Sequence, residues 1–327
     1  MAKLLEAQTV LKERYTVVSP IGQGGMGAVY RAEDMLLPGR ICAVKEIAPS
    51  ADMSTDLVTQ LQEQFRREAE VLARLDHPNL PKVSDYFTQD GREYLIMDFV
   101  PGHDLRTLID DARIAQHPLS EKQVLDWVHQ LCNALAYMHA QEPPILHRDI
   151  KPSNIKLTPS GFIKLVDFGL VKLLTNDESR TVTVIQGRGT AAYTPLEQYG
   201  GDDAHTGIHS DIYALGATLY HLLTGKPPAT ARERFLNPDA LIPPREINSQ
   251  IAPHIERIII AALALHPNER PQTIEMFREA LERPGFIFPI TPPNLDAQEW
   301  QTALQANLPL IIALVTLMVL AILITPL

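Results

Sequence analysis

Two short segments place several chemically reactive residues close together in the sequence. The first, from His147 to Asn154, reads His-Arg-Asp-Ile-Lys-Pro-Ser-Asn, and the second is Asp167-Phe168-Gly169. Together they supply a candidate base, a lysine that can bind phosphate and two oxygen ligands for a metal ion. Transfer of a phosphoryl group to a hydroxyl needs this set on neighbouring loops of one fold. These segments therefore constrain the fold more than any other feature.

Each of these residues has its own predicted role. Asp149 is the candidate base, because a carboxylate can accept or orient the proton of the attacking hydroxyl. Lys151 lies two residues further on and can reach the transferred phosphoryl group. Asn154 and Asp167 offer oxygen ligands, which Mg²⁺ prefers, and Mn²⁺ is a possible substitute. Any one of them alone is more often an ordinary loop residue, but the ordered set indicates a site.

A glycine-rich segment near the N-terminus is a candidate phosphate cradle. Residues 22–29 read Gly-Gln-Gly-Gly-Met-Gly-Ala-Val and match G-x-G-x-x-G-x-V. Glycine is needed where backbone amides approach phosphate oxygens closely. A dinucleotide-binding unit begins with similar glycines but continues as a helix. Here the following Ala28–Ala32 has the pattern of a strand, so we expect a hairpin.

Lys45 follows Ala43 and Val44 on the next predicted strand and is a candidate for binding the α- and β-phosphates of a nucleotide. In isolation it also fits a surface lysine on an alternating strand. A cation among apolar residues needs an acidic partner. Glu68 and Glu70 both lie on the following predicted helix, and helical periodicity puts them on different flanks. Spacing alone therefore leaves the choice between them open.

Apolar patterning predicts a β-rich part followed by a helical part. The first part is expected to contain strands and one helix, at Tyr15–Ile21, Ala28–Ala32, Ile41–Ile47, Lys82–Phe87, Tyr94–Phe99 and, for the helix, Asp56–Leu75. After Pro101-Gly102 we expect helices along Val124–Met138, Asp211–Leu223, Ile255–Leu265 and Ile274–Leu281. Ser120 and Ser210 are expected to cap the first two, and Gly225 to end the second.

Composition narrows the class of protein. A chain of 327 residues can hold one two-lobed domain. The formal net charge of −10 argues against nucleic acid as a partner, because no basic excess is available to neutralise phosphates. Cys42 and Cys132 lie in apolar runs and are expected to be buried free thiols in a reducing cytosol.

The C-terminal segment Leu308–Leu327 contains no charged residue. Its length of about 20 residues spans a bilayer as a helix. A buried core helix is the alternative, but Thr316 and Thr325 are its only polar residues. Met1–Arg14 lacks the apolar core of a signal peptide. We therefore expect a single-pass anchor in the cytoplasmic membrane, a proline-rich linker over Pro284–Asn307 and a catalytic part in the cytosol.

Through these motifs the chain resembles the eukaryotic-like (Hanks-type) serine/threonine protein kinases of bacteria over residues 15–283. The resemblance implies an α+β class, bilobal protein-kinase fold, with an N-lobe at about 15–97, a hinge at about 98–102 and a C-lobe at about 103–283. It implies that ATP lies between the lobes and that Glu68 pairs with Lys45. The residues expected to contact the nucleotide are Ile21, Gly22, Gly24, Gly27, Val29, Ala43, Lys45, Glu68, Met97, Asp98 and Val100. The expected catalytic residues are Asp149, Lys151, Asn154 and Lys45, and the expected metal ligands are Asn154 and Asp167.

Other positions follow from the same resemblance. Arg148 looks like the arginine that meets a phosphorylated activation loop, in which Thr181 or Thr183 is the expected autophosphorylation site. The remaining matches are Asp211 and Gly216 of a D-x-x-x-x-G motif, Arg270 as partner of Glu197, and Thr190 facing the acceptor hydroxyl. The chain departs from the family where Ala-Pro-Glu is usual, because it reads Pro195-Leu196-Glu197. The glutamate is retained, so its pairing with Arg270 is still expected.

Two alternative functions remain open. A catalytically weak kinase-like scaffold would bind nucleotide and partners without turnover, although the intact Lys45, Asp149, Asn154 and Asp167 speak against it. A small-molecule kinase is disfavoured by the Lys-Pro after Asp149 and by the long loop 170–193, which resembles a peptide-substrate activation loop. The favoured hypothesis is a Mg-ATP-dependent kinase of protein serines and threonines, with a transient homodimer for autophosphorylation.

Overall fold

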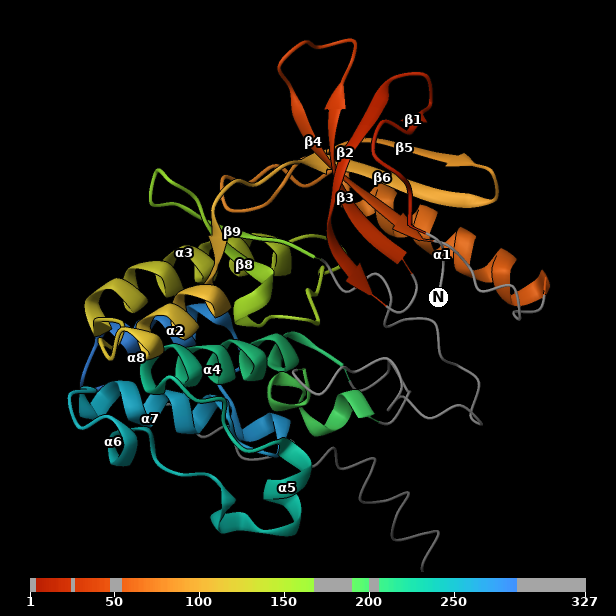
Figure 1. The fold of residues 1–327 in the computed structure, drawn as a ribbon. Coiled ribbons are helices and arrows are strands. Elements are labelled where there is room, and N and C mark those ends of the chain that lie inside the picture. Colours follow the sequence, from red (N-terminus) through yellow and green to blue (C-terminus); the bar gives the residue numbers. More distant parts are fainter. Residues whose placement is uncertain (1–3, 25–26, 48–54, 168–189, 200–205, 287–327) are drawn as a thin grey trace, which may run out of the picture. The chain divides into compact units, whose positions relative to one another are not determined.

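The computed structural model describes residues 4–24, 27–47, 55–167, 190–199 and 206–286, with the side chains of 24, 55–57, 60, 61, 64, 67 and 68 left out (Figure 1). These residues form a β-rich small lobe and a mainly helical large lobe. The predicted bilobal arrangement is therefore confirmed.

The small lobe is built on a six-stranded antiparallel sheet in the order β1-β2-β3-β4-β6-β5. Its elements are β1 (Val10–Leu11), β2 (Tyr15–Gly24), β3 (Gly27–Asp34), β4 (Ile41–Ile47), α1 (Thr55–Leu72), β5 (Val83–Gln89) and β6 (Arg92–Asp98). The five predicted strands and the helix are all present, with ends that differ by up to three residues. Strand β1 was not predicted, because two residues carry too little periodicity to be recognised.

The two faces of this sheet belong to different apolar clusters. Along β4, Cys42 and Val44 join a cluster that we call the outer cluster, consisting of Leu11, Tyr15, Val17, Ala28, Tyr30, Ala32, Cys42, Val44, Tyr94 and Ile96. Ala43 and Ile47 instead join the main core, together with Phe65 of α1. This alternation follows from the two-residue period of a strand. Lys45 and Glu46 are neighbours in sequence and therefore point to opposite faces.

The large lobe combines helices with a small three-stranded sheet. The helices are α2 (Leu105–Ile114), α3 (Glu121–His139), α4 (Ile208–Thr224), α5 (Ala231–Leu236), α6 (Pro244–Ile247), α7 (Pro253–Ala262) and α8 (Ile274–Glu282). The strands are β7 (His103–Asp104), β8 (Ile155–Leu157) and β9 (Ile163–Leu165), in that order in the sheet. Short 3₁₀ turns occur at Pro152–Asn154 and Leu196–Tyr199.

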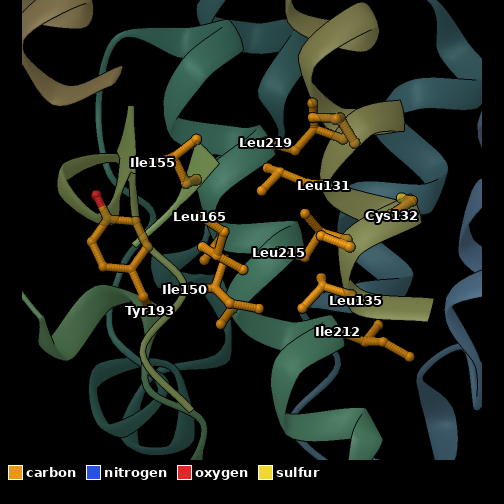
Figure 2. Packing of buried hydrophobic residues seen from close by; sticks show 14 of the residues in the cluster. Leu131, Cys132, Leu135, Ile150, Ile155, Leu165, Tyr193, Ile212, Leu215 and Leu219 are labelled. Carbon is orange, nitrogen blue, oxygen red and sulfur yellow. The ribbon is translucent and has the colours of Figure 1, made fainter. Parts of the chain in front are cut away.

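Helix α3 shows how the sequence pattern produces the core. The five residues predicted to form its apolar face are all fully buried, namely Val124, Val128, Leu131, Leu135 and Met138. Figure 2 shows Leu131 and Leu135 on one helix facing Leu215 and Leu219 of α4. Ser120 caps α3 as expected, because its hydroxyl accepts the amide of Gln123 at 3.3 Å.

The prediction that Ser210 caps α4 was wrong. The helix begins two residues earlier, at Ile208, and Ser210 lies in its first turn. The Ser210 hydroxyl accepts the amide of Gly207 at 3.3 Å and donates to Glu197 at 2.8 Å. Gly225 ends the helix as predicted, in a left-handed conformation with φ of 70°.

Other sequence predictions have mixed outcomes. Cys42 and Cys132 are both buried free thiols, as predicted, and burial raises the pKa of Cys42 to about 11. Within the part of the chain that the structure describes, no helix has both the length and the apolar character to cross a bilayer. The proposed anchor, Leu308–Leu327, lies outside those residues.

Candidate active site

The loop that carries Asp149 folds back on itself. The 3₁₀ turn at Pro152–Asn154 returns the chain, so that the Asn154 side-chain amide donates to the backbone oxygen of Asp149 at 2.8 Å and to Asp149 Oδ2 at 3.0 Å. Lys151 Nζ donates to the same Oδ2 at 2.9 Å. The sequence placed these three residues within one segment, and the structure brings their polar atoms together.

Thr190 joins this group from a different part of the chain. Its hydroxyl accepts a hydrogen bond from Lys151 Nζ at 3.2 Å. Lys151 thus bridges Asp149 and Thr190 with a single ammonium group. This contact places the segment around Thr190 next to the candidate base, while the role of Thr190 in facing the acceptor hydroxyl stays a prediction.

A buried carboxylate on α4 holds the backbone of the Asp149 loop. Asp211 is fully buried, and its two oxygens accept the amides of His147 and Arg148 at 2.9 and 2.8 Å. His139 Nε2 lies 2.9 Å from Asp211 Oδ2. Burial alone would raise the pKa of Asp211, but the hydrogen bonds and the His139 charge outweigh it and lower the pKa.

The same loop contains a strained residue. Arg148 has a φ of 64°, a left-handed value that costs a non-glycine residue about 1–3 kcal/mol. The hydrogen bonds from the amides of His147 and Arg148 to Asp211 hold the backbone in this conformation. Strain of this kind is found where the surrounding structure over-determines a functional loop.

Asp167 lies beside the loop and contacts the small lobe. The amide of Val166 donates to the backbone oxygen of Asn154 at 2.8 Å, which brings the chain before Asp167 next to Asn154. Lys45 Nζ lies 3.2 Å from Asp167 Oδ1. Lys45 is largely buried, with 12% of its side chain exposed, whereas Asp167 is 47% exposed. The predicted phosphate-binding lysine and the predicted metal ligand are therefore direct neighbours.

The donor set at Asn154 and Asp167 fits a hard divalent cation. The Asn154 amide nitrogen donates both of its hydrogen bonds to Asp149, which leaves the amide oxygen as the atom that this residue can offer. Asp167 adds carboxylate oxygens, and its φ of 58° is a second left-handed value at the site. Oxygen donors of this kind are the ligands that Mg²⁺ takes in proteins.

Four of the residues expected to contact the nucleotide, Val29, Ala43, Lys45 and Met97, lie on one face of the small-lobe sheet. Val29 is paired with Lys45, and Ala43 with Met97, across the strands. Ala43 and Met97 belong to the main core, against which Val29 also packs. The glycine-rich segment forms the predicted hairpin, since Gly22 pairs with Val29 and Gly24 with Gly27. Ile21 is 48% exposed at its edge.

Of the two glutamates that could pair with Lys45, the structure describes the side chain of Glu70 and not that of Glu68. Glu70 is exposed and forms an i,i+4 ion pair with Arg66 on α1, with the two atoms 2.7 Å apart. The side chain of Glu68 lies outside the described residues. Its pairing with Lys45 therefore stays an expectation from the resemblance.

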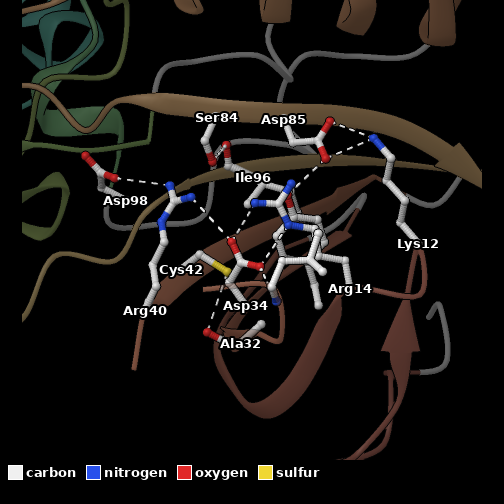
Figure 3. A network of polar contacts seen from close by, with 12 residues as sticks. Lys12, Arg14, Ala32, Asp34, Arg40, Cys42, Ser84, Asp85, Ile96 and Asp98 are labelled. Carbon is white, nitrogen blue, oxygen red and sulfur yellow. Dashed lines mark hydrogen bonds and ion pairs between the residues drawn. The ribbon is translucent and has the colours of Figure 1, made fainter. Parts of the chain in front are cut away.

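A polar network of the small lobe reaches Asp98 of the predicted hinge (Figure 3). Arg14 makes two hydrogen bonds to the buried Asp34, at 2.8 and 2.7 Å. Arg40 contacts Asp34 at 3.4 Å and Asp98 at 3.8 Å. Asp98 also accepts the amide of Lys82 at 3.2 Å. The hinge residue Asp98 is thus contacted by two segments of the small lobe, those of Arg40 and Lys82, while Val100 is buried two residues later.

The retained glutamate of the Pro-Leu-Glu segment forms the expected ion pair. Arg270 donates to both oxygens of Glu197, at 2.6 and 3.1 Å, and its side chain is fully buried. Burial alone would raise the pKa of Glu197, but Arg270 and Ser210 lower it. Arg270 also lies over the ring of Tyr213, 4.9 Å from its centroid. The displaced proline therefore leaves this contact intact.

Sequence reasoning missed one residue that joins the lobes. Asn79 carries no predicted role, yet it is 5% exposed and contacts the large lobe three times. Its side chain donates to Ile163 O at 2.8 Å and to Gln130 at 3.1 Å, and its backbone oxygen accepts the amide of Leu165. No local pattern marks such a residue, because its partners lie far along the chain.

Comparison with known proteins identifies the family. The family model described as "Protein kinase domain" matches residues 15–284. A probable serine/threonine-protein kinase of Corynebacterium efficiens is 34% identical over 286 residues, covering 84% of this chain and 41% of the relative. Serine/threonine-protein kinase B of Synechocystis sp. is 32% identical, covering 84% and 47%. This chain thus spans less than half the length of these relatives.

Solved structures give the same result. The apo form of PpkA-294 aligns with a TM-score of 0.72 at 30% identity, covering 86% of this chain and all of that one. The kinase domain of Mycobacterium tuberculosis PknI aligns with a TM-score of 0.66 at 29% identity, covering 85% and 98%. The chain belongs to the protein kinase family, among relatives that are bacterial serine/threonine-protein kinases.

Proposed function

We propose that this chain transfers the γ-phosphoryl group of ATP to serine and threonine hydroxyls of protein substrates. The observation that carries the proposal is the position of Lys151, whose ammonium lies 2.9 Å from Asp149 Oδ2 and 3.2 Å from Thr190 Oγ1. A base, a cation and the segment that receives the acceptor hydroxyl thus meet at one point. The Lys-Pro that follows Asp149 in the sequence favours serine and threonine over tyrosine as acceptors.

The roles of the side chains follow from their charges. Asp149 orients the acceptor hydroxyl and takes its proton as the oxygen attacks phosphorus. Lys151 then stabilises the negative charge on the transferred group, and Lys45 holds the phosphates that remain with the nucleotide. Both lysines are already hydrogen-bonded to carboxylates, so little reorganisation is needed when the phosphates arrive.

A divalent cation belongs to this proposal. Asn154 and Asp167 would hold it, because they present oxygen donors next to Lys45 and Asp149. When bound, Mg²⁺ neutralises charge on the phosphate oxygens. The position of these ligands depends on Asp211, which fixes the backbone of the loop that carries Asp149 and Asn154.

The decisive test is Asp149→Asn. This change keeps the shape of the side chain but removes the base, so phosphorylation of myelin basic protein should fall by roughly 10²–10⁴-fold. Asp126→Asn on the exposed side of α3 is the matched control and should keep wild-type turnover, since Asp126 is 60% exposed and pairs with Lys122 at the surface. Wild-type protein without transfer activity would favour the scaffold alternative. An Asp149→Asn variant within twofold of wild type would exclude Asp149 as the base.

Autophosphorylation is a second part of the proposal. Thr181 and Thr183 lie outside the described residues, midway along the segment between Asp167 and Glu197. One molecule of a transient homodimer would phosphorylate the other. The phosphate adds about −1.5 to −2 charges and can pair with Arg148. Mass spectrometry after incubation with Mg-ATP should find one of them modified in wild type and neither in Asp149→Asn. An active preparation with both threonines unmodified would contradict this.

Membrane attachment is the third part. It rests on the uncharged Leu308–Leu327 segment alone, which lies outside the described residues. Full-length protein should stay with membranes after a high-salt wash and leave them in detergent, with its kinase lobes facing the cytosol. A variant that ends at Asn307 should be soluble and equally active. Recovery of the full-length chain as a soluble monomer would disprove the anchor.

A further inference from the structure

A buried carboxylate lies directly next to Lys45 in sequence and on the opposite face of the sheet. Glu46 is 2% exposed, among the residues of the outer cluster. It accepts three hydrogen bonds, from Tyr30 OH at 2.7 Å, from Arg92 at 2.6 Å and from Tyr94 OH at 3.2 Å. A carboxylate in an apolar cluster is costly unless it is paired in this way, so its placement requires an explanation.

The strand register explains why these donors meet Glu46. Tyr94 is its direct cross-strand neighbour on β6, and Arg92 lies two residues further along the same face. Tyr30 on β3 is paired with Val44, and therefore lies diagonally opposite Glu46. One carboxylate thus ties three adjacent strands together at the position of the phosphate-binding lysine.

The backbone of Glu46 also touches the phosphate cradle. Gly27, the last glycine of that segment, is so close that a Cβ atom there would lie 1.8 Å from the Glu46 carbonyl oxygen. A movement of Glu46 would therefore shift both Lys45 and the end of the glycine-rich hairpin. Both elements handle phosphate in the proposed reaction.

The N-terminal segment 4–11 covers this cluster. The amide of Leu5 donates to the Tyr30 hydroxyl at 3.1 Å, and Leu4 and Leu5 pack against the outer cluster. Strand β1 pairs with β2 and fixes the segment to the sheet edge. The kinase family model begins its match at Tyr15, so the segment precedes the part that the family shares. Because the Tyr30 hydroxyl binds both Leu5 and Glu46, it links the N-terminal segment directly to Glu46.

An open groove of about 350 Å³ lies between the segment and the β5–β6 turn, lined by Leu4, Leu5, Leu11, Arg92 and Tyr94. The segment is held by the packing of its leucines, by the Tyr30 contact and by its pairing with β2.

We propose that Glu46 is a positioning residue for Lys45, and that residues 4–11 hold it in place through the hydroxyl of Tyr30. The inference rests on the proposed kinase activity, because Lys45 has its role there. Loss of the Tyr30 hydroxyl removes the bridge between Leu5 and Glu46 and leaves the ring in the cluster. Lys45 then loses its fixed position against Asp167 and the phosphates.

The test compares two buried tyrosines of the outer cluster. Tyr30→Phe removes the hydroxyl that binds Glu46, whereas Tyr15→Phe removes one that binds Asp85 at 2.9 Å on the far strand β5. Because a misplaced catalytic group costs up to about 10²-fold, kcat of Tyr30→Phe should fall about tenfold. Its KM for ATP should change by less than about twofold, since Ala43, Met97 and Val100 are untouched. Tyr15→Phe should keep the wild-type kcat and KM for ATP, although its melting temperature should fall about as much as that of Tyr30→Phe. Deletion of residues 2–9 should reproduce the effect of Tyr30→Phe.

Two results would overturn the inference. One is a Tyr30→Phe variant with wild-type kcat, and the other is an equal loss of kcat in Tyr30→Phe and Tyr15→Phe, which would show a merely structural role. If Tyr30→Phe yields no folded protein, Glu46→Gln against Asp85→Asn carries the same comparison. Inactive wild-type protein would count against the proposed function instead. Hydrogen exchange along β4 still tests the inference in that case, because only Tyr30→Phe should speed it.

Discussion

The two lobes each bury a carboxylate beside the active site, but hold it differently. Asp211 in the large lobe accepts two backbone amides of the loop that carries Asp149. Glu46 in the small lobe accepts only side-chain donors, including Tyr30 and Arg92. A backbone amide in a packed loop can change direction only if the loop itself moves, whereas a side chain can rotate. The large-lobe site is therefore fixed by the fold itself, and the position of Lys45 depends on what covers the small lobe.

The largest expected effect is at Asp211. Asp211→Ala leaves two buried amides unpaired, at about 1–3 kcal/mol each, so unfolding free energy should fall by about 4 kcal/mol. Glu46→Ala should cost about half of that, because Arg92, its charged donor, is 28% exposed and can turn towards water. Urea unfolding of both variants measures the difference. Equal losses at the two positions would break the comparison between the lobes.

A third buried carboxylate sharpens the comparison within the large lobe. Arg270→Met removes the partner of Glu197 and should reduce stability by about 3 kcal/mol, because a buried charge loses its partner. The loss falls at the low end of the usual range since Ser210 still donates to Glu197. The double variant Arg270→Met/Glu197→Leu should regain most of the loss in the same unfolding assay. If it does not, the arginine stabilises mainly through its backbone contacts and Tyr213.

The large lobe also buries the neutral imidazole of His221, and this makes the unfolding free energy of the protein depend on pH. Burial lowers the pKa of His221 to about 4, and its Nδ1 forms a hydrogen bond of 2.5 Å with the Tyr193 hydroxyl. Below the ordinary pKa of about 6.5, the unfolded chain binds a proton that the folded state excludes. Stability from this group is therefore complete above pH 6.5 and is lost as pH falls towards 4. Between pH 7.5 and 5 the loss should be about 2 kcal/mol.

His221→Gln isolates this contribution, because glutamine can accept the same hydroxyl without titrating. Urea unfolding at the two pH values should show a smaller decrease for His221→Gln than for wild type. An unchanged decrease would assign the pH dependence to other groups.

The smallest effect is expected at an exposed pair. Lys122 and Asp126 form an i,i+4 pair at 3.0 Å on the solvent side of α3, with both side chains more than half exposed. Lys122→Ala should change stability by less than about 0.5 kcal/mol, and this small effect should vanish in 1 M salt. A change comparable to that at Arg270 would show that burial does not separate strong from weak charge pairs here.

The candidate residues of the site could be predicted from the sequence because they are close together along the chain. Asp149, Lys151 and Asn154 lie within six positions, and one turn suffices to join them. The α3 face was predictable for the same reason, since its period of 3.6 residues is local. The prediction of Ser210 as a cap failed because Glu197, thirteen residues earlier in the chain, binds that hydroxyl and the helix begins before it.

The sequence by itself determined the family, the two-lobed division and which side chains are candidates for the reaction, because each depends on local spacing and period. Only the tertiary structure decided which distant groups hold them. Asp211 meets the Asp149 loop from 63 residues away, and Glu46 meets Arg92 from 46 residues away. Side chains so far apart carry no mutual pattern in the chain. Their contact exists only after strands and helices have packed and water has been excluded from the groups between them.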